Sequence, residues 1–547
     1  MRQPVRTFGS NTKLMSVGSL LSERLLTGGI LEYALLILAS LPARLGTMRA
    51  SLWLDEAWVA NSILSPSWKG MFYYPDWVQS SPSLFLALAR LLTKVFGPSE
   101  PALRLLPVLA GLMAIPVLAI ALRKLFSPAS ALCGTSLVIV NFWAAKYAQH
   151  VKQYGSDLFV SAVLVALITR YCYRPDRRNF TLLVGGFFVV SFLANTALFM
   201  GPSVIAAVAL APLWRPPLYL RVGRLKIALA SFVLCGALNY LVFIRPNRSP
   251  GLRAYWADSC LNPSHPFTSA RDLFNSFAEL LVPQTFPGTY YLGAAIVLAM
   301  IAGVVIALIG CARRSKKAVV ILLLGPLPLA VAMMVSLLGQ YPLLRYPRIL
   351  LWALPGCAVL LVTTLDPLFN ALRQGMARGH EAPIFYGTTA ACLCAVLAFD
   401  LVVMRNPRPN EQNGEAMRLL HSSMSPSDGL FVHGRMIQQY YYYSRLQGWA
   451  PRRLYVGNTD WPCCPRNRAA VPVDPGIPGY AKDLRQAVAQ VERPGHLWMF
   501  LPSGQQGHSE FLIWMLVATP SLMQGQSCYE SHREGFDQAL LLAYQCR

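Results

Sequence analysis

The sequence predicts an all-α polytopic membrane protein with a small C-terminal α/β domain. Its 547 residues are 54% hydrophobic and only 13% charged, whereas soluble domains carry about 25% charged residues. Apolar stretches of roughly 17–25 residues, the length that crosses a bilayer as a helix, recur through residues 1–404. In residues 405–547 short strand-like runs alternate with helix-like segments. That change predicts a separate α/β domain.

Eleven apolar segments are predicted as transmembrane helices. They cover residues 27–47, 100–122, 130–147, 156–172, 180–197, 200–214, 226–244, 288–311, 318–338, 348–365 and 386–404. Short alternating segments, which would indicate strands that span the membrane, are absent from the sequence. We therefore expect a helical membrane domain over 1–404 and an exterior domain over 405–547.

Basic residues predict the orientation of these helices, because short cytoplasmic loops are rich in Lys and Arg. The basic clusters lie in alternate short loops, at 123–124, 170–178, 215–226 and 313–317. We expect the opposite side to be external and to carry 48–99, 146–157, 245–287, 340–348 and 405–547. The net charge of +23 fits loops that face anionic membrane lipids. No nucleic-acid recognition motif accompanies this charge, so no nucleic acid is expected as a partner.

Five of the twelve cysteines fall on the predicted external side, where an oxidising compartment favours disulfides. They are Cys260, Cys463, Cys464, Cys528 and Cys546. Their pairing cannot be read from the sequence and stays open.

The first external loop, 48–99, contains the main acidic candidates. Asp55 and Glu56 lie in "SLWLDEAW", and Asp76 follows Tyr74 and precedes Gln79 in "YYPDWVQSSP". Carboxylates bind hydroxyl groups and remove protons, and the surrounding aromatic rings stack on sugars. The alternative is that the acids end the first helix and the aromatic residues form an interfacial belt. We favour the first interpretation because acids at a helix C-terminus oppose the macrodipole.

Two further external segments carry cations. In "YAQHVKQYGSDLF" (147–159), a helix would place Gln149, Lys152 and Gln153 on one face, with Tyr154 beside them. A lysine at the bilayer boundary suits a lipid phosphate; the alternative is a lysine that snorkels to the interface at a helix end. In "YPLLRYPRILLWALPG" (341–356), two arginines three residues apart, Arg345 and Arg348, can converge on one phosphate or seek lipid headgroups.

These candidates indicate chemistry on a lipid-linked substrate. No Walker A, GxGxxG or HExxH motif is present in the sequence. An activated group would therefore arrive on a membrane-soluble carrier that has a phosphate leaving group. A carboxylate would take the acceptor proton, and Lys and Arg would stabilise the departing phosphate.

The ordered motifs "SLWLDEAW", "DWVQSSP", "FGPSEPALRLLPVLAG", "YAQHVKQYGSD" and "RYPRILLWALP" resemble a known superfamily. It comprises the C-type integral-membrane glycosyltransferases that use polyprenyl-phosphate sugars, in particular bacterial relatives of protein O-mannosyltransferases and of the aminoarabinose lipid A transferase. The likeness covers residues 25–370, and "GLFVHGRMIQQYYYYS" is similar to an exterior domain of one bacterial subgroup. The resemblance implies the C-type glycosyltransferase fold and transfer with inversion in the bacterial inner membrane, with the site on the periplasmic side.

The resemblance also implies roles for individual residues. Asp55 matches the acid at the reaction centre and Glu56 its neighbour. Asp76 with Gln79 matches a D-x-x-Q motif, the run Lys152–Tyr154 matches K-Q-Y, and Arg348 matches a basic residue before a late span. One departure stands out, because the subgroup usually has Glu where this chain has His150. A neutral imidazole can act as base or ligand. The departure therefore leaves open whether the protein uses a divalent cation and whether it is active.

We therefore predict a hexosyl or pentosyl transferase with a lipid, glycan or protein acceptor. The predicted catalytic residues are Asp55, Glu56 and Asp76. The predicted donor-phosphate ligands are Lys152, Arg345 and Arg348. The predicted substrate-binding residues are Tyr74, Gln79, Gln149, His150, Gln153 and Tyr154. The alternatives are a transporter or flippase of lipid-linked sugars and a catalytically inactive relative.

Overall fold

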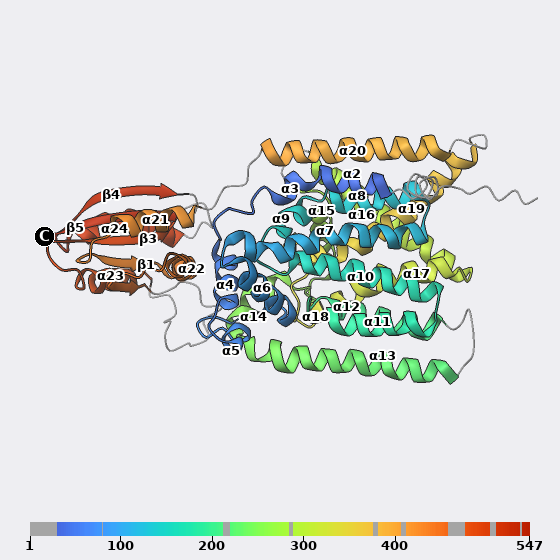
Figure 1. Cartoon of the computed structure of the whole chain (residues 1–547), viewed down its shortest axis with the longest axis horizontal. Coiled ribbons are helices and arrows are strands. Elements are labelled where there is room, and N and C mark those ends of the chain that lie inside the picture. The colour runs from blue at the N-terminus through green and yellow to red at the C-terminus, as the bar shows by residue number, and fades with distance from the viewer. Residues whose placement is uncertain are drawn as a thin grey trace, which may run out of the picture.

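The computed structural model shows a bundle of helices with a smaller sheet-containing domain at one end (Figure 1). The residues it describes are 30–78, 80–211, 219–283, 288–375, 381–405, 412–457, 476–503, 510–536 and 539–547.

The bundle is formed by helices between Ile30 and Arg405. In chain order they are α2 (Ile30–Ala39), α3 (Leu41–Leu45), α7 (Glu100–Leu125), α8 (Pro128–Ile139), α9 (Phe142–Ala148), α10 (Tyr154–Tyr173), α11 (Arg177–Val190), α12 (Ala197–Leu210), α13 (Tyr219–Leu238) followed by the π-helix η2 (Asn239–Ile244), α16 (Thr289–Ala312), α17 (Lys316–Leu324), α18 (Pro326–Leu337), the 3-10 helix η5 (Pro347–Ala353), α19 (Leu354–Gly375) and α20 (Glu381–Arg405).

Seven helical segments within the described ranges are long and apolar enough to cross a membrane, or eight if the bent pair α8 and α9 is one span. Each of the eleven predicted segments coincides with one or two helices of the bundle. Three of them correspond to shorter helices: α2 with α3, then α11, then α12. The chain is thus a multi-pass membrane protein, and the number of eleven crossings stays a prediction.

The basic loops meet at one end of the bundle. The ammonium groups of Lys124 and Lys316 both lie over the ring of Tyr173, at centroid distances of 6.0 and 4.9 Å. The guanidinium of Arg224 donates a hydrogen bond of 2.7 Å to the carbonyl of Pro175. Tyr173 ends α10, a helix of 20 residues, so this cluster lies about 30 Å from the start of α10 at Tyr154.

Short helices cover the other end of the bundle, next to the sheet-containing domain (Figure 1). They are α4 (Leu54–Ile63), α5 (Trp68–Phe72), α6 (Ser83–Phe96), α14 (Pro250–Trp256) and α15 (Pro266–Leu281). The amphipathic stretch "SLFLALARLLTKVF" forms α6, which buries Phe85 and Ala89 and leaves Val95 exposed.

Two local expectations for this end are wrong. Asp55 and Glu56 do not end the first helix; they lie in the first turn of α4, where the helix macrodipole stabilises negative charge. The two acids therefore do not oppose a helix dipole, and that reason for a catalytic role is wrong. Residues 149–153 are not helical either, because α9 ends at Ala148 and α10 starts at Tyr154.

The C-terminal part contains one mixed sheet with helices around it. Its elements are α21 (Asn413–Ser423), β1 (Gly429–Val432), α22 (Ile437–Gln447), β2 (Arg453–Val456), α23 (Gly476–Val488), β3 (Gly495–Pro502), α24 (Glu510–Gln524), β4 (Cys528–Phe536) and β5 (Ala539–Cys546). The strand order is β2-β1-β3-β5-β4, with β1 parallel to β2 and β3, and β5 antiparallel to β3 and β4. The predicted small C-terminal α/β domain is confirmed, and its boundary at residue 405 stays a prediction.

A disulfide joins two of the predicted external cysteines. Cys528 and Cys546 are bonded across the paired strands β4 and β5. Cys260 is a free thiol in this structure. Cys463 and Cys464 lie outside the described residues.

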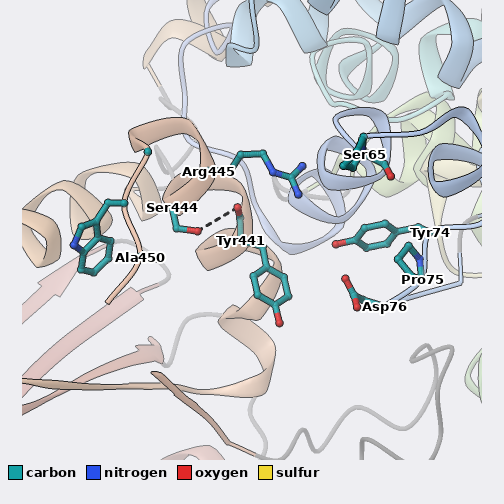
Figure 2. A pocket seen from close by; sticks show the side chains of 11 residues that line it. Ser65, Tyr74, Pro75, Asp76, Tyr441, Ser444, Arg445 and Ala450 are labelled. Carbon is teal, nitrogen blue, oxygen red and sulfur yellow. Dashed lines mark hydrogen bonds between the residues drawn. The ribbon is translucent and has the colours of Figure 1, made fainter. Parts of the chain in front are cut away.

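Direct hydrogen bonds hold the C-terminal domain on the bundle. The Tyr443 hydroxyl on α22 accepts from the Leu52 backbone N–H at 2.7 Å. The Asn61 side-chain amide on α4 donates to the Gln438 carbonyl at 2.8 Å. Beside this contact a cleft opens between α22 and the loop that follows α5 (Figure 2). The domain thus forms part of the surface next to α4.

Candidate functional site

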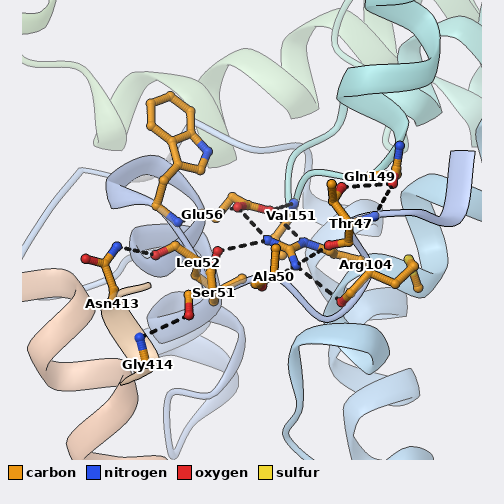
Figure 3. Close-up of polar contacts among 12 residues, drawn as sticks. Thr47, Ala50, Ser51, Leu52, Glu56, Arg104, Gln149, Val151, Asn413 and Gly414 are labelled. Atoms are coloured by element: carbon orange, nitrogen blue, oxygen red, sulfur yellow. Dashed lines mark hydrogen bonds and ion pairs between the residues drawn. The ribbon is translucent and has the colours of Figure 1, made fainter. Parts of the chain in front are cut away.

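A buried ion pair fixes the start of α4. Glu56, in the first turn of this helix, meets the Arg104 guanidinium of α7 at 2.8 Å. The other Glu56 oxygen accepts from Arg104 Nε at 3.0 Å and from the Val151 backbone N–H at 2.8 Å. The two side chains are only 2% and 3% exposed. Glu56 therefore ties three segments together, and its oxygens are directed at protein donors (Figure 3).

Arg104 also organises the loop before α4. Its guanidinium donates to four backbone carbonyls of this loop, those of Thr47, Met48, Ala50 and Ser51. Burial by itself would raise the pKa of Glu56, but Arg104, together with the nearby His150 and Val151, holds that pKa below its ordinary value. Glu56 thus stays ionised, and the loop–helix junction that carries Asp55 is held in one conformation.

Asp55 lies in the same helical turn and points to a different environment. It is partly exposed and interacts electrostatically with Lys152, Arg348 and Tyr255. These partners come from the α9–α10 loop, from η5 and from α14. The structure therefore brings together the acid and the two cations that the sequence predicted on separate external segments.

The two cations lie over tryptophan rings, one in α4 and one at its N-cap. The Lys152 ammonium lies 5.5 Å from the ring centroid of Trp58, and the Arg348 guanidinium lies 5.8 Å from that of Trp53. Trp53 caps α4 and Trp58 lies one turn beyond Asp55. Cation–π contact holds each positive group near the carboxylate without neutralising it.

Several buried donors at this site lack a hydrogen-bond acceptor within the described part of the chain. They are Arg348 Nε and the indole N–H groups of Trp53 and Trp58. Buried donors in native proteins nearly always have partners, so this group is one that a bound acceptor-rich ligand would satisfy.

The loop 149–153 places Lys152 through its neighbours. The Gln149 amide is buried, accepts from Thr47 and donates to the carbonyls of Ala43 and Ala145 at 2.8 and 3.0 Å. Gln149 thus holds the loop, and its intramolecular bonds do not favour the predicted contact with substrate.

Gly155 lets α10 pack tightly on α7, because a Cβ there would overlap the Pro107 carbonyl.

Burial lowers the pKa of the Lys152 ammonium below its ordinary value; Asp55 opposes this shift and Arg348 adds to it. Desolvation of the Lys152 ammonium thus outweighs the attraction of the nearby Asp55 and Glu56 carboxylates. An anionic ligand between Lys152 and Arg348 would relieve their mutual repulsion.

Aromatic rings line the rest of this region. The ring of Tyr147 packs edge-on against Tyr154 and His150, at 5.2 and 5.1 Å. His150 also lies 6.1 Å from Trp53. Tyr154 interacts electrostatically with Arg348 and Asp55. The predicted residues His150 and Tyr154 thus lie at the site, whereas the Gln153 side chain reaches Ser81, whose hydroxyl donates to it at 3.4 Å.

Three predicted residues lie elsewhere. Asp76 and Tyr74 line the cleft beside α22, and among the described residues the charges that act on Lys152 are those of Asp55, Arg348 and Glu56, not Asp76. Arg345 is exposed, and its backbone N–H donates to Ser276 Oγ at 2.9 Å. Gln79 lies outside the described residues.

Sequence reasoning missed Arg104 and Tyr255. Arg104 had a usable signal, because it is a charged residue inside the long apolar helix 100–125, where isolated charges are rare and need a partner. Tyr255 had none, since nothing local to α14 indicates that it approaches Asp55.

No group of three or more His, Cys, Asp or Glu side chains in the described ranges is arranged to hold a metal ion. Glu56, the acid next to Asp55 in the sequence, directs its oxygens at Arg104 and Val151. These residues do not fit a divalent cation.

The arrangement was compared with known proteins. No family model matches the sequence, and no curated protein matches it. Among solved structures, ArnT from Cupriavidus metallidurans in the apo state is similar, with a TM-score of 0.58 and 12% sequence identity over 95% of this chain and 98% of that chain. The same protein bound to undecaprenyl phosphate has a TM-score of 0.51 and 13% identity over 94% and 97%. At such low identity the likeness concerns the fold alone, and it confirms the predicted fold class.

Proposed function

We propose that this protein transfers a sugar from a polyprenyl-phosphate carrier to an acceptor, at the end of the bundle that carries the C-terminal domain. The observation that carries the proposal is the meeting of Asp55 with Lys152 and Arg348 around buried donors that have no hydrogen-bond acceptor in the described ranges. The ArnT structure bound to undecaprenyl phosphate supports a carrier of this class for a chain of the same fold. The sugar and acceptor are not specified by these contacts.

The transfer would be a single displacement. Asp55 accepts the proton of an acceptor hydroxyl while that oxygen bonds to the anomeric carbon. The bond from this carbon to the phosphate oxygen breaks, and its electron pair leaves with the phosphate. Lys152, Arg348 and the indole N–H groups stabilise the negative charge that develops. Attack opposite the leaving group inverts the anomeric centre.

The proposal places this reaction on the periplasmic face of a bacterial inner membrane. In its support, the basic loops gather about 30 Å away at the other end of α10. The absence of a nucleotide-binding motif from the sequence also fits a side without nucleotide sugars.

Removing either cation is expected to weaken carrier binding. We expect Lys152→Ala and Arg348→Ala each to raise the Kd for undecaprenyl phosphate at least about tenfold, roughly 1.4 kcal/mol, because each removes a charge from a partly desolvated phosphate site. Titration of the purified full chain in nanodiscs measures this. Lys69→Ala and Arg253→Ala, which remove exposed cations at the same end, are matched controls with unchanged Kd.

Equal affinities in all four variants would contradict the phosphate site. Translocation of lipid-linked sugar in proteoliposomes without transfer would favour the transporter alternative. Carrier binding without turnover, with every acceptor class supplied, would favour an inactive relative.

Carrier affinity is expected to fall as pH rises. A phosphodiester-linked sugar keeps one negative charge, whereas Lys152 must be protonated to bind it. The pKa of Lys152 is lowered in the protein without carrier, so the ammonium loses its proton at a lower pH than that of an ordinary lysine. Carrier binding above that pH therefore requires proton uptake. Affinity is therefore highest below this pKa and declines through it.

The control for this pH effect is Lys152→Arg, which stays protonated and should flatten the decline. The neighbouring charges, Asp55, Glu56 and Arg348, do not change in this variant. An affinity independent of pH in the native protein, or the same decline in Lys152→Arg, would show that Lys152 is not the titrating group.

A further inference from the structure

A cleft of about 490 Å³ lies between the first external loop and the C-terminal domain (Figure 2). One wall is formed by residues 65–66 and 74–76, and the other by residues of α22 and the turn after it. The Arg445 guanidinium bridges the walls, donating to the Leu64 carbonyl at 3.2 Å. The cleft therefore exists only because the C-terminal domain docks on the bundle.

The side chains that line the cleft are aromatic and polar, with one acidic and one basic group among them. Tyr74 and Asp76 lie on the loop side of the cleft, and Tyr441 and Arg445 lie on the α22 side, with Arg445 extended toward the loop (Figure 2). Trp449 lines the same space. The Tyr74 hydroxyl donates weakly to Gln438 at 3.4 Å, and Asp76 is exposed to the cleft.

The hydroxyl groups in the cleft remain donors. Burial, together with the nearby Asp76 carboxylate, raises the pKa of Tyr74 and of Tyr441. The two phenols therefore stay protonated across the range in which the protein would work. The cleft thus offers neutral donors, one carboxylate and one guanidinium beside aromatic faces.

We propose that this cleft binds the saccharide portion of a glycan acceptor, an inference that rests on the proposed function. Planar carboxylate and guanidinium groups bind pairs of hydroxyls, and aromatic rings stack on the apolar face of a sugar. The volume is that of a site for a small organic ligand. One negative and one positive group do not favour a phosphate, in contrast to the two cations beside Asp55.

The cleft adjoins the transfer site through one aromatic wall. Trp77 packs edge-on against Trp58 at 5.6 Å, and Tyr74, Trp77 and Ile437 belong to one apolar cluster with Trp58. The Lys152 ammonium also lies over the Trp58 ring, 5.5 Å from its centroid. A glycan held in the cleft would thus extend past this wall toward Asp55, which makes Asp76 an acceptor-binding residue rather than a group at the reacting atoms.

The test uses chitotetraose and maltotetraose as probes, with an unglycosylated Ser/Thr peptide for comparison. Saturation-transfer NMR on the full chain in nanodiscs should show saturable binding of at least one oligosaccharide, with a Kd on the order of millimolar because a small polar ligand buries little apolar area. Tyr441→Ala, Asp76→Asn and Arg445→Met should each weaken it at least about tenfold. Leu446→Ala, an exposed neighbour on α22 that does not line the cleft, should not.

Carrier affinity separates this inference from the proposed function. All three cleft variants should bind undecaprenyl phosphate like the native chain, which also shows that they fold. Where transfer is measured, they should raise KM for a glycan acceptor and leave kcat within about twofold. Absence of saturable binding by both oligosaccharides, equal binding in the cleft variants, or binding of the peptide alone would overturn the inference. If the cleft variants lose oligosaccharide binding while Lys152→Ala still binds the carrier, the saccharide site in the cleft is supported. The proposed carrier-phosphate site at Lys152 is then contradicted.

Discussion

Replacement of Asp55 with asparagine is expected to lower kcat for sugar transfer by about 10²–10⁴-fold, the usual contribution of a positioned general base. Asparagine keeps the size of the side chain and the first turn of α4, but it cannot accept the acceptor proton. Within the described part of the chain, Asp55 forms no close ion pair; it interacts electrostatically with Lys152, Arg348, Tyr154 and Tyr255. Folding and carrier binding should therefore survive the change.

The measurement is transfer by purified protein supplied with polyprenyl-phosphate sugars and acceptor, beside a carrier-binding titration. Asp76→Asn is the matched control, because it makes the same substitution in an acid that lies in the cleft. It should alter the acceptor KM and spare kcat. Undiminished turnover in Asp55→Asn would exclude Asp55 as the base, and a loss of carrier binding instead of turnover would assign it to donor orientation.

Hydropathy was sufficient to predict the helices because the bilayer requires every spanning segment to be long, apolar and internally hydrogen-bonded. It failed at the junction between the first helix and α4. There the chain leaves the helix at Leu45 and starts a new one at Leu54. The intervening turn is held by Arg104, about fifty residues away. No local pattern reports such a contact.

The same reason explains which site residues the sequence could place together. Asp55, Lys152 and Arg348 were predicted on one face because alternate loops share a side of the membrane, and the structure brings them into one electrostatic neighbourhood. Asp76 was grouped with Asp55 because both lie in the first external loop and because Asp76 and Gln79 match the D-x-x-Q motif of the resembled superfamily. Its actual neighbours, Tyr441 and Arg445, belong to a domain whose docking position leaves no mark on the sequence of the loop.

Strand prediction shows a related limit in the C-terminal domain. The apolar runs of β1, β3 and β5 are buried, which makes them recognisable. The β4 sequence "CYESHREGF" is mostly exposed and lies at the edge of the sheet. An edge strand covered by polar residues has no period-2 apolar signal, and its pairing depends on the partner, β5.

Replacement of Glu56 with glutamine is expected to destabilise the protein by about 3–5 kcal/mol, the cost of removing one partner from a buried ion pair. The change leaves the Arg104 guanidinium, 3% exposed, without its counter-charge. It also weakens the acceptor for the Val151 N–H, which lies beside Lys152. Stability should therefore fall together with carrier affinity, in contrast to Asp55→Asn, which affects turnover alone.

The stability of the folded protein is expected to depend on pH through the same ion pair. The pKa of Glu56 is lowered from 4.5 in the folded protein, so its ion pair contributes stability above that value. The contribution is lost as pH falls through the lowered pKa. Unfolding followed in detergent by denaturant titration should show this acid loss in the native protein and a smaller one in Glu56→Gln.

The double variant Glu56→Gln/Arg104→Met distinguishes an ion pair from a general packing defect. Replacing both charged partners with neutral side chains removes the uncompensated charge, so part of the lost stability should return. The recovery should be incomplete, because Arg104 also donates to the carbonyls of the loop before α4, and methionine cannot. Additive losses in the double variant would mean that the two residues stabilise the fold independently. Asp55 would then be positioned by α4 packing rather than by the Glu56–Arg104 pair.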